Sequence, residues 1–361
     1  MIFEKIKKLN YLFLFIILII STIGFLALFS ASNGSLDPWA KKQIIRFIIC
    51  FVLLISISLI DIKILYKYTY IIFFLSFLLL ASVEIAGTFG LGAKRWIRIF
   101  GISIQPSELI KITIILALSK YYHNLKFENI GKVISVVFPL IVILSSCAFV
   151  LIQPDLGTTI IILLLGTIIM FVAGTKIWKF VLSLLVFLIS LPIFWNNLKP
   201  YQHKRVLSFL DPESDPLGAG YHSIQSKIAI GSGGFWGKGL FAGTQSRLNF
   251  LPEKHTDFIF SVFAEETGFF GVILLISLFT FIILKGLNIA FRAADRFGFF
   301  LSLGLIISIA FYIIFNIGMT VGIFPITGIP LPFVSYGGSS LITNYFAVGL
   351  LLNVEMRRTL H

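Results

Sequence analysis

Charged residues are scarce in this sequence: they make up 12% of its 361 residues, whereas soluble domains carry about 25%. Hydrophobic residues make up 58%, and the mean hydropathy is +0.99. This composition excludes the two or three soluble domains that the length alone would predict. It predicts instead an integral membrane protein.

Cysteine and histidine are also rare. The two cysteines, Cys50 and Cys147, lie within apolar runs, which argues against a disulfide framework and against a zinc site. The five histidines show no spacing typical of metal ligands. The sequence therefore leaves any metal ligands unidentified and indicates no organic cofactor.

Acidic residues are outnumbered: 16 Asp and Glu stand against 29 Lys and Arg, giving a net charge of +13. On a soluble protein this excess would favour nucleic-acid binding. Here the basic residues fall between apolar runs, so membrane topology and anionic lipid explain them better. We expect membrane lipid as a partner and no nucleic acid.

Long apolar runs are abundant, and a spanning helix needs about 20 apolar residues. We predict an all-α fold of about ten transmembrane helices in one membrane domain, 1–361. The first run is longer than a signal-peptide core and is expected to stay uncleaved. The predicted spans are 11–30, 44–60, 69–87, 106–122, 133–152, 156–173, 177–195, 257–284, 297–320 and 339–355.

Basic residues in the short loops predict the orientation. With the N-terminus inside, every inner loop carries at least two basic residues, and Arg357 and Arg358 place the C-terminus on the same side. The short outer loops should then be poor in such residues. They nevertheless hold or adjoin six basic residues: Lys41, Lys42, Arg46, Lys94, Arg95 and Arg98. Either these side chains extend to lipid headgroups, or an anionic ligand binds at the outer face.

Two segments are irregular. Segment 196–256, between the seventh and eighth spans, is glycine-rich, and we interpret it as an extracytoplasmic loop of re-entrant or interfacial helices. Its stretch His222–Gly231 has helical spacing. Segment 321–338 contains three prolines that forbid a continuous helix. Irregular backbone at membrane depth is tolerated where it lines a protein or water-filled cavity.

Ionisable groups inside spans are functional candidates. Glu108 and Lys111 share a helix face, and they form either a site or a pair that only neutralises itself during insertion. Asp155 opens the sixth span, where a helix-capping acid is the alternative. Asp257 lies where the outer segment enters the eighth span, so it is a candidate general base at the water boundary. The Gly-Gly-Ser run ending at Ser339 offers backbone N–H groups to an anion.

Five short motifs are spread along the chain: Lys94-Arg95-Trp96-Ile97, Gln105-Pro106-Ser107-Glu108, Gln153-Pro154-Asp155-Leu156-Gly157, His255-Thr256-Asp257-Phe258 and Ser335-Tyr336-Gly337-Gly338-Ser339. Together these motifs resemble the SEDS family of bacteria (shape, elongation, division, sporulation) over essentially the whole chain. The outer stretches 237–246 and 328–332, with Lys254, resemble its RodA branch more than its FtsW branch.

The resemblance implies a peptidoglycan glycosyltransferase that polymerises lipid II into β-1,4 glycan at the periplasmic face of the bacterial inner membrane, during elongation and rod-shape maintenance. It implies a class B penicillin-binding protein as transpeptidase partner, together with other elongation-complex membrane proteins. It makes Asp257 the essential acid and places counterparts of Arg95, Glu108, Lys111 and Asp155 in the polar cavity. It also allows a divalent cation, Mg²⁺ or Mn²⁺.

The predicted reaction inverts the anomeric carbon and expels pyrophosphate, which needs no protonating acid, unlike the alkoxide leaving group of a glycosidase. One carboxylate and several cations are then enough. We expect Asp257 to be the base toward the acceptor's 4-hydroxyl. Arg95 and Lys111 would hold pyrophosphate, with Arg205 and Lys254 as secondary candidates.

Two other functions stay open from the sequence. A lipid II flippase would need charged or broken helices at the midplane and access from both sides, whereas the ionisable residues here cluster toward one face. A non-catalytic scaffold for a penicillin-binding protein would have no need of a carboxylate beside so many cations.

Overall fold

The computed structural model describes residues 6–90, 93–99, 102–198, 200–215, 218–248, 250–251 and 253–358, apart from a few side chains, Arg205 among them. Within these ranges, each predicted span coincides with a helix, and the all-α architecture is confirmed. The helices are α2 (Tyr11–Ala31), α3 (Trp39–Leu59), α4 (Ile62–Ala86), α5 (Pro106–Asn124), α6 (Ile134–Ile152), α7 (Leu156–Val172), α8 (Ile177–Asn197), α12 (Ile259–Phe291), α13 (Arg296–Val321) and α14 (Gly338–Arg358).

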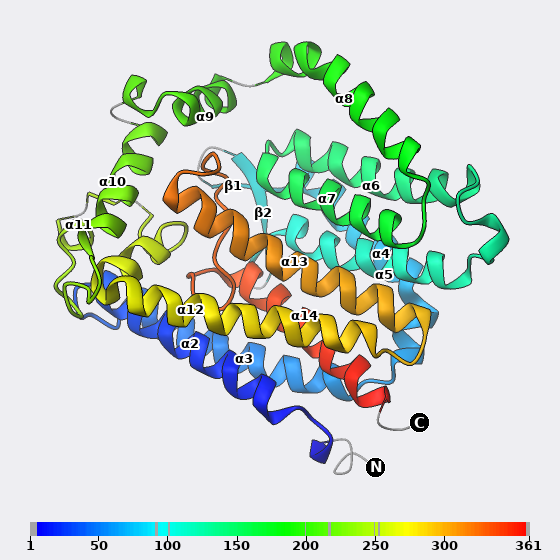
Figure 1. Cartoon of the computed structure of the whole chain (residues 1–361), viewed down its shortest axis with the longest axis horizontal. Helices are drawn as coiled ribbons and strands as arrows, with labels where there is room; N and C mark the ends of the chain where they lie inside the picture. Colours follow the sequence, from blue (N-terminus) through cyan, green and yellow to red (C-terminus); the bar gives the residue numbers. More distant parts are fainter. Residues whose placement is uncertain are drawn as a thin grey trace.

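Helices α5 and α14 differ from the rest in polarity and position. Six of the described helices (α2, α3, α4, α6, α12 and α13) are long and apolar enough to span a membrane, while α7 and the part Ile177–Ile193 of α8 are shorter apolar stretches. The α5 and α14 helices carry more polar residues, and both pack inside the bundle, against α13 and against each other (Figure 1). Because their neighbours are helices and not lipid, they tolerate polar side chains.

Capping residues explain where several helices begin. The side chains of Asn10, Asp61 and Asp295 accept hydrogen bonds from backbone N–H groups in the first turns of α2, α4 and α13. Asp61 starts α4 at Ile62, earlier than the predicted 69. Helix α3 begins at Trp39, ahead of the predicted 44, so the basic residues expected to flank that span lie within its first turns.

The long segment 196–256, predicted to be extracytoplasmic and here called the outer segment, is built from short helices. It contains α9 (Pro200–Leu210), the 3₁₀ turn η2 (Pro212–Ser214), α10 (Ala219–Ser232) and α11 (Thr244–Arg247). The predicted helical stretch His222–Gly231 lies within α10. Figure 1 shows α8 standing away from the bundle and leading into α9. Its side chains are mostly exposed, as expected of a helix surrounded by lipid.

One element was not predicted. The outer loop between α4 and α5 forms an antiparallel sheet of β1 (Thr88–Gly90), β2 (Ala93–Ile99) and β3 (Ile102–Ile104). Strand β2 pairs with β1 on one side and β3 on the other. Trp96, Ile97 and Ile99 suit a strand, and successive side chains of a strand point to opposite faces, which places Arg95 and Arg98 on opposite faces.

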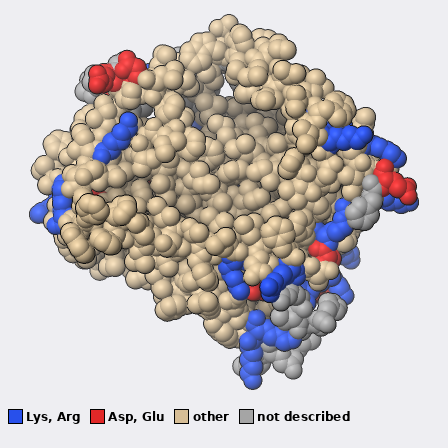
Figure 2. Space-filling view, viewed as in Figure 1, with Lys and Arg blue, Asp and Glu red and all other residues tan. Residues whose placement is uncertain are grey.

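The positions of the termini and of the charged residues are those of a multi-pass membrane protein. Both termini lie on the same side of the bundle (Figure 1), as expected for the predicted even number of spans. Figure 2 shows Lys and Arg gathered toward the ends of the helices, with the middle of this face free of charge. An uncharged band between charged ends fits a bilayer core about 30 Å thick.

Candidate active site

A polar cavity of about 630 Å³ opens where the irregular outer segments meet the ends of the buried helices. It is lined by residues from β2, α5, α7, α9, α10, α13, α14 and the two predicted irregular segments. They are Arg95, Trp96, Gln105, Glu108, Asp155, Thr158, Lys204, Asp215, Gly218, His222, Glu253, Thr256, Asp257, Tyr312, Ile326, Thr327, Gly328, Ile329, Pro330, Tyr336, Gly337, Gly338, Ser339 and Ser340. The cavity therefore joins parts of the chain that are far apart in sequence.

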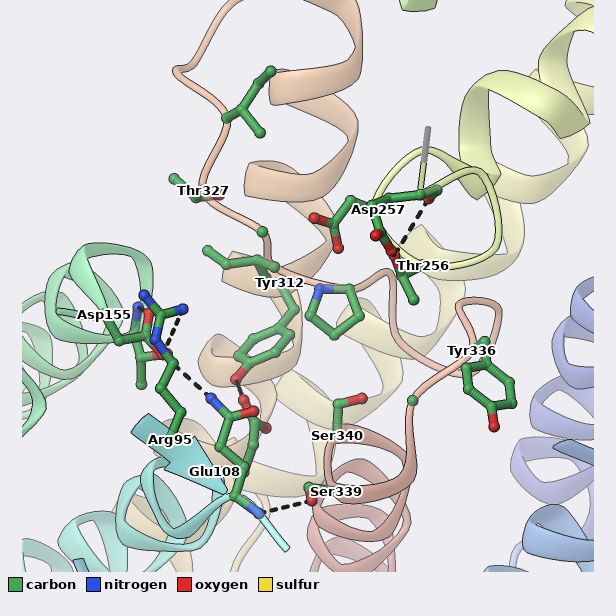
Figure 3. A pocket seen from close by; sticks show the side chains of 18 of the residues that line it. Arg95, Glu108, Asp155, Thr256, Asp257, Tyr312, Thr327, Tyr336, Ser339 and Ser340 are labelled. Carbon is green, nitrogen blue, oxygen red and sulfur yellow. Dashed lines mark hydrogen bonds and ion pairs between the residues drawn. The ribbon is translucent and has the colours of Figure 1, made fainter. Parts of the chain in front are cut away.

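Asp257 lies in the turn that precedes α12, and its carboxylate points into this cavity (Figure 3). A Cβ atom at Gly328 would lie 3.4 Å from its Oδ2, and Gly328 has φ +70°. A distance of 3.4 Å is an ordinary van der Waals contact, so the positive φ, and not a lack of space, favours glycine at this position. The backbone of segment 326–330 thus passes directly beside the acid predicted as the catalytic base.

The backbone around Asp257 is fixed by α13 and by the second irregular segment. Asn316 Nδ2 donates hydrogen bonds to the carbonyl oxygens of Asp257 (3.1 Å) and Ile329 (2.7 Å). Ser335 Oγ donates to the carbonyl of Thr256 at 2.6 Å, and the Tyr336 N–H donates to His255 O at 2.9 Å. Segments 253–258 and 326–336 therefore form one rigid wall. The predicted absence of helix between α13 and α14 is confirmed.

Arg95 and Asp155 form a polar cluster on the opposite wall (Figure 3). Arg95 Nε donates to Gln153 O at 3.0 Å, its Nη2 donates to Pro154 O, and Nη1 lies 4.0 Å from Asp155 Oδ2. Asp155 also caps α7, since its Oδ1 accepts from the Thr158 N–H at 3.2 Å. The capping interpretation is confirmed, and the same carboxylate lines the cavity. These bonds leave Arg95 oriented and only partly neutralised.

Glu108 and Lys111 form the predicted ion pair, with Nζ 2.8 Å from Oε1. Tyr312 donates to Glu108 Oε1 at 2.7 Å, Thr343 donates to Oε2 at 3.1 Å, and Lys111 Nζ lies 4.0 Å from the centre of the Tyr312 ring. Glu108 lines the main cavity, whereas Lys111 is 3% exposed and lies beneath it. Lys111 thus does not line the cavity itself, and its ion-pair partner Glu108 lies between it and the cavity.

Ser339 lies in the first turn of α14, at the floor of the cavity (Figure 3). Its Oγ accepts from the Gln105 N–H at 2.9 Å and lies 3.3 Å from Ser103 O. This contact ties the start of α5 to the start of α14. The N-terminal ends of both helices therefore face the same cavity, and their dipoles favour an anion there.

Arg205 and Lys254 are the secondary candidates for holding pyrophosphate. The side chain of Arg205 lies outside the described residues, although its backbone is part of α9. Lys254 does not line the cavity: its Nζ donates to the carbonyl of Ser246 at 2.6 Å. Burial lowers the pKa of the Lys254 ammonium group.

A polar group on the α9–α10 side of the cavity was not predicted from the sequence. Lys204 Nζ lies 3.4 Å from Asp215 Oδ1. Burial alone would raise the pKa of the Asp215 carboxyl, but hydrogen bonds from Ser208 and Lys204 hold it below its usual value. Burial lowers the pKa of His222, against the opposing charges of Asp215 and Glu253, so its imidazole is mainly neutral near pH 7. No motif marked these residues.

A divalent cation would find few protein ligands here. Among the described residues, no group of three or more His, Cys, Asp or Glu side chains could hold a metal ion. The chain offers single carboxylates, such as those of Asp257 and Asp155, on separate walls. A bound Mg²⁺ would need the rest of its oxygen shell from substrate phosphates and water, a common arrangement for this ion.

Comparison with known proteins places this site in context. The profile of the cell cycle protein family of FtsW, RodA and SpoVE matches residues 10–360. Peptidoglycan glycosyltransferase MrdB of Escherichia coli K12 is 38% identical over 351 residues, covering 96% of this chain and 93% of that protein. Stage V sporulation protein E of Bacillus subtilis is 37% identical over 359 residues, covering 96% of each.

Solved structures show the same fold. A chain from a peptidoglycan synthase complex, studied for its coordination of polymerization and crosslinking, superimposes with a TM-score of 0.84 at 30% identity, covering 97% of this chain and 98% of that one. The rod shape determining protein RodA of Thermus thermophilus superimposes with a TM-score of 0.73 at 28% identity, covering 97% of each. The likeness spans the whole membrane domain and includes the outer segments that form the cavity.

Proposed function

This chain belongs to the FtsW, RodA and SpoVE family and is a peptidoglycan glycosyltransferase, and we propose that it polymerises lipid II in the cavity beside Asp257. The observation that carries the proposal is the placement of one carboxylate, Asp257, across a polar cavity from the guanidinium of Arg95. In an inverting displacement, the base acts on the attacking hydroxyl and the cation stabilises the leaving group on the opposite side of the reacting carbon. A carboxylate and a guanidinium on facing walls suit these two roles.

In the proposed reaction, the 4-hydroxyl oxygen of the acceptor sugar attacks the anomeric carbon of the donor. The bond between that carbon and the pyrophosphate oxygen breaks, and the hydroxyl proton passes to the Asp257 carboxylate. Undecaprenyl pyrophosphate leaves as an anion and needs no proton. One product strand, one lipid pyrophosphate and one proton account for all atoms.

Arg95 and the two helix ends would stabilise the leaving group. Arg95 is oriented by the carbonyls of Gln153 and Pro154, so its position is set before substrate arrives. The N-terminal ends of α5 and α14 add partial positive charge on the same side. Preorganised positive charge that meets developing negative charge is usually a large catalytic term. When bound, a divalent cation would add charge at the same phosphates.

Lys111 would act from beneath the cavity. Its charge is largely balanced by Glu108, so we assign this pair to orienting Tyr312 and the cavity floor more than to direct phosphate contact. Asp155 and Ser339 would position Arg95, α5 and α14 through the contacts described above. Arg205 remains a candidate for contact with the substrate's outer part, whereas Lys254 lies outside the cavity lining and donates to the Ser246 carbonyl instead.

The site's location fits a lipid-linked substrate. A membrane-embedded chain with a polar cavity at one end can receive a polar headgroup while the lipid tail stays in the bilayer. We place the cavity at the periplasmic face of the bacterial inner membrane and both termini in the cytoplasm, as the basic inner loops predict. We further propose a class B penicillin-binding protein as partner, alongside other proteins of the elongation complex.

The direct test is polymerisation by the purified full chain, with and without a class B penicillin-binding protein whose transpeptidase is blocked. Lipid II and Mg²⁺ are added, and glycan is resolved on a gel. Long glycan that requires this chain supports the proposal. Lipid II that crosses vesicle membranes without being polymerised would favour a flippase. Glycan made equally well without this chain would favour a scaffold.

A further inference from the structure

Two adjacent acids, Glu265 and Glu266, lie inside α12 and take no part in the proposed reaction. Glu265 is fully buried, at 0% exposure, and Glu266 is 3% exposed. Buried acids within a spanning helix are costly and usually have a role. They are not among the residues that line the cavity. The hydrogen-bond donors around the two carboxylates indicate a structural role.

The carboxylate of Glu265 collects donors from one outer segment. Its Oε1 lies 2.6 Å from Lys238 Nζ and accepts hydrogen bonds from the N–H groups of Thr244 (2.8 Å) and Gln245 (3.1 Å). The Thr244 hydroxyl adds a fourth contact at 3.0 Å. The N–H groups of Phe241 and Gly243 bond to Glu266, whose carboxylate also accepts from Ser30. We call residues 237–247, which these acids hold, the outer brace.

The backbone of α12 is interrupted where the outer brace packs against it. Gly268 has φ +65°, which interrupts the helix, and the freed carbonyls of Glu265 and Glu266 accept from the N–H groups of Lys238 and Gly239, both at 3.0 Å. A Cβ at Gly237 would lie 2.1 Å from Glu266 O, so the approach requires glycine. The brace is therefore attached to α12 through both backbone and side chains.

The far end of the brace is attached to the turn that holds Asp257. Ser246, in α11, accepts a hydrogen bond through its carbonyl from Lys254 Nζ at 2.6 Å. Lys254 precedes Asp257 by three residues, and Asp257 itself stands two residues before α12. Asp257, α12, Glu265, the brace and Lys254 thus close a loop of contacts, so the turn is held from both ends.

The geometry points to Glu265, Lys238 and Lys254 as positioning residues that fix the Asp257 turn through the outer brace. This inference rests on the proposed role of Asp257 as base. It gives Lys254 a role other than contact with pyrophosphate. Displacing a reacting group by about 1 Å can lower a rate by about 100-fold, so an effect on kcat is expected even though none of the three touches substrate.

The test uses the full chain with saturating penicillin-binding protein and measures kcat and KM for lipid II per folded molecule. Glu265→Gln and Lys238→Met should each lower kcat by about tenfold or more and leave KM within about twofold. The double variant should recover part of that loss, since it leaves no unpaired buried charge. Lys254→Met should lower kcat similarly, and Lys254→Arg should retain most of it.

Arg247→Gln is the matched control, because it removes an exposed positive charge from α11 without touching the anchoring contacts. It should behave as wild type. Unchanged kcat in folded Glu265→Gln and Lys238→Met would overturn the inference, as would losses confined to KM. Asp257→Asn, run alongside, separates the two ideas: if it still polymerises, the proposed function fails whatever the brace variants do.

Discussion

The side-chain amide of Asn316 holds the backbone of Asp257, donating to its carbonyl oxygen at 3.1 Å while also donating to Ile329 at 2.7 Å. Asn316 is completely buried in α13. One amide thus joins the turn that carries the proposed base to the segment that passes beside its carboxylate. The irregular backbone at this site is ordered by groups from a regular helix.

Replacing Asn316 should therefore disturb both stability and rate. Asn316→Leu keeps the volume but leaves two carbonyl groups without this donor, at a cost of about 1–3 kcal/mol for each buried group left unpaired. We expect a lower unfolding temperature and a kcat reduced by about tenfold or more. Thermal unfolding and glycan synthesis measure the two effects. Asn197→Ala, at an exposed asparagine of α8, is the control, and equal behaviour of the two variants would contradict the assignment.

Arg95→Lys should weaken stabilisation of the leaving group. Lysine keeps the charge but cannot reproduce the bonds to Gln153 and Pro154, so its ammonium would not be oriented. A loss of about 1.5–3 kcal/mol corresponds to a fall in kcat/KM of about 10- to 100-fold. Arg98→Lys, on the opposite face of the same strand, should have little effect. Similar losses in both variants would show that Arg95 has no special position.

The ion pair beneath the cavity makes a separate prediction. Lys111→Met should destabilise the protein by about 3–5 kcal/mol, because it leaves Glu108 buried without its partner. Adding Glu108→Gln should restore much of that stability. If the pair only orients the cavity floor, the restored double variant should regain part of its activity. A stable double variant without any activity would instead return Lys111 to the direct phosphate role that the sequence indicated.

The half-buried imidazole of His222 predicts a pH effect on stability. Burial lowers its pKa below the ordinary value of 6.5, so the unfolded chain binds a proton more readily than the folded chain. Stability should then fall as the pH drops from about 6.5 toward the lower folded pKa. The comparison is thermal unfolding between pH 7.5 and pH 5.5 for wild type and His222→Gln. The variant should show a weaker decline, and an unchanged decline would contradict this account.

Hydropathy predicted the helices because lipid-facing segments must be apolar, and it found even α5 and α14, which carry more polar residues than the other helices of the bundle but keep an apolar run at their centre. It did not predict the small sheet, since three short strands give a weak pattern beside long helices. Glu108, Arg95 and Asp257 stood out as charges near apolar runs. Tyr312 and Asn316 did not, because their importance comes from contacts with Glu108 and Asp257, which lie 204 and 59 residues away in the chain. Glu265 and Glu266 also stand out in the sequence, as two adjacent acids within one predicted span, although no role was predicted for them.

The most direct test of the central claim is the rate of glycan synthesis by Asp257→Asn. Asparagine preserves the size of the side chain and removes its ability to accept the proton from the acceptor hydroxyl. Wild type and variant are compared at equal folded concentration, with the penicillin-binding protein present and its transpeptidase blocked, and Asp37→Asn at an exposed outer acid is the control. The account predicts glycan from wild type and Asp37→Asn but none from Asp257→Asn. Glycan from Asp257→Asn at close to the wild-type rate would contradict it.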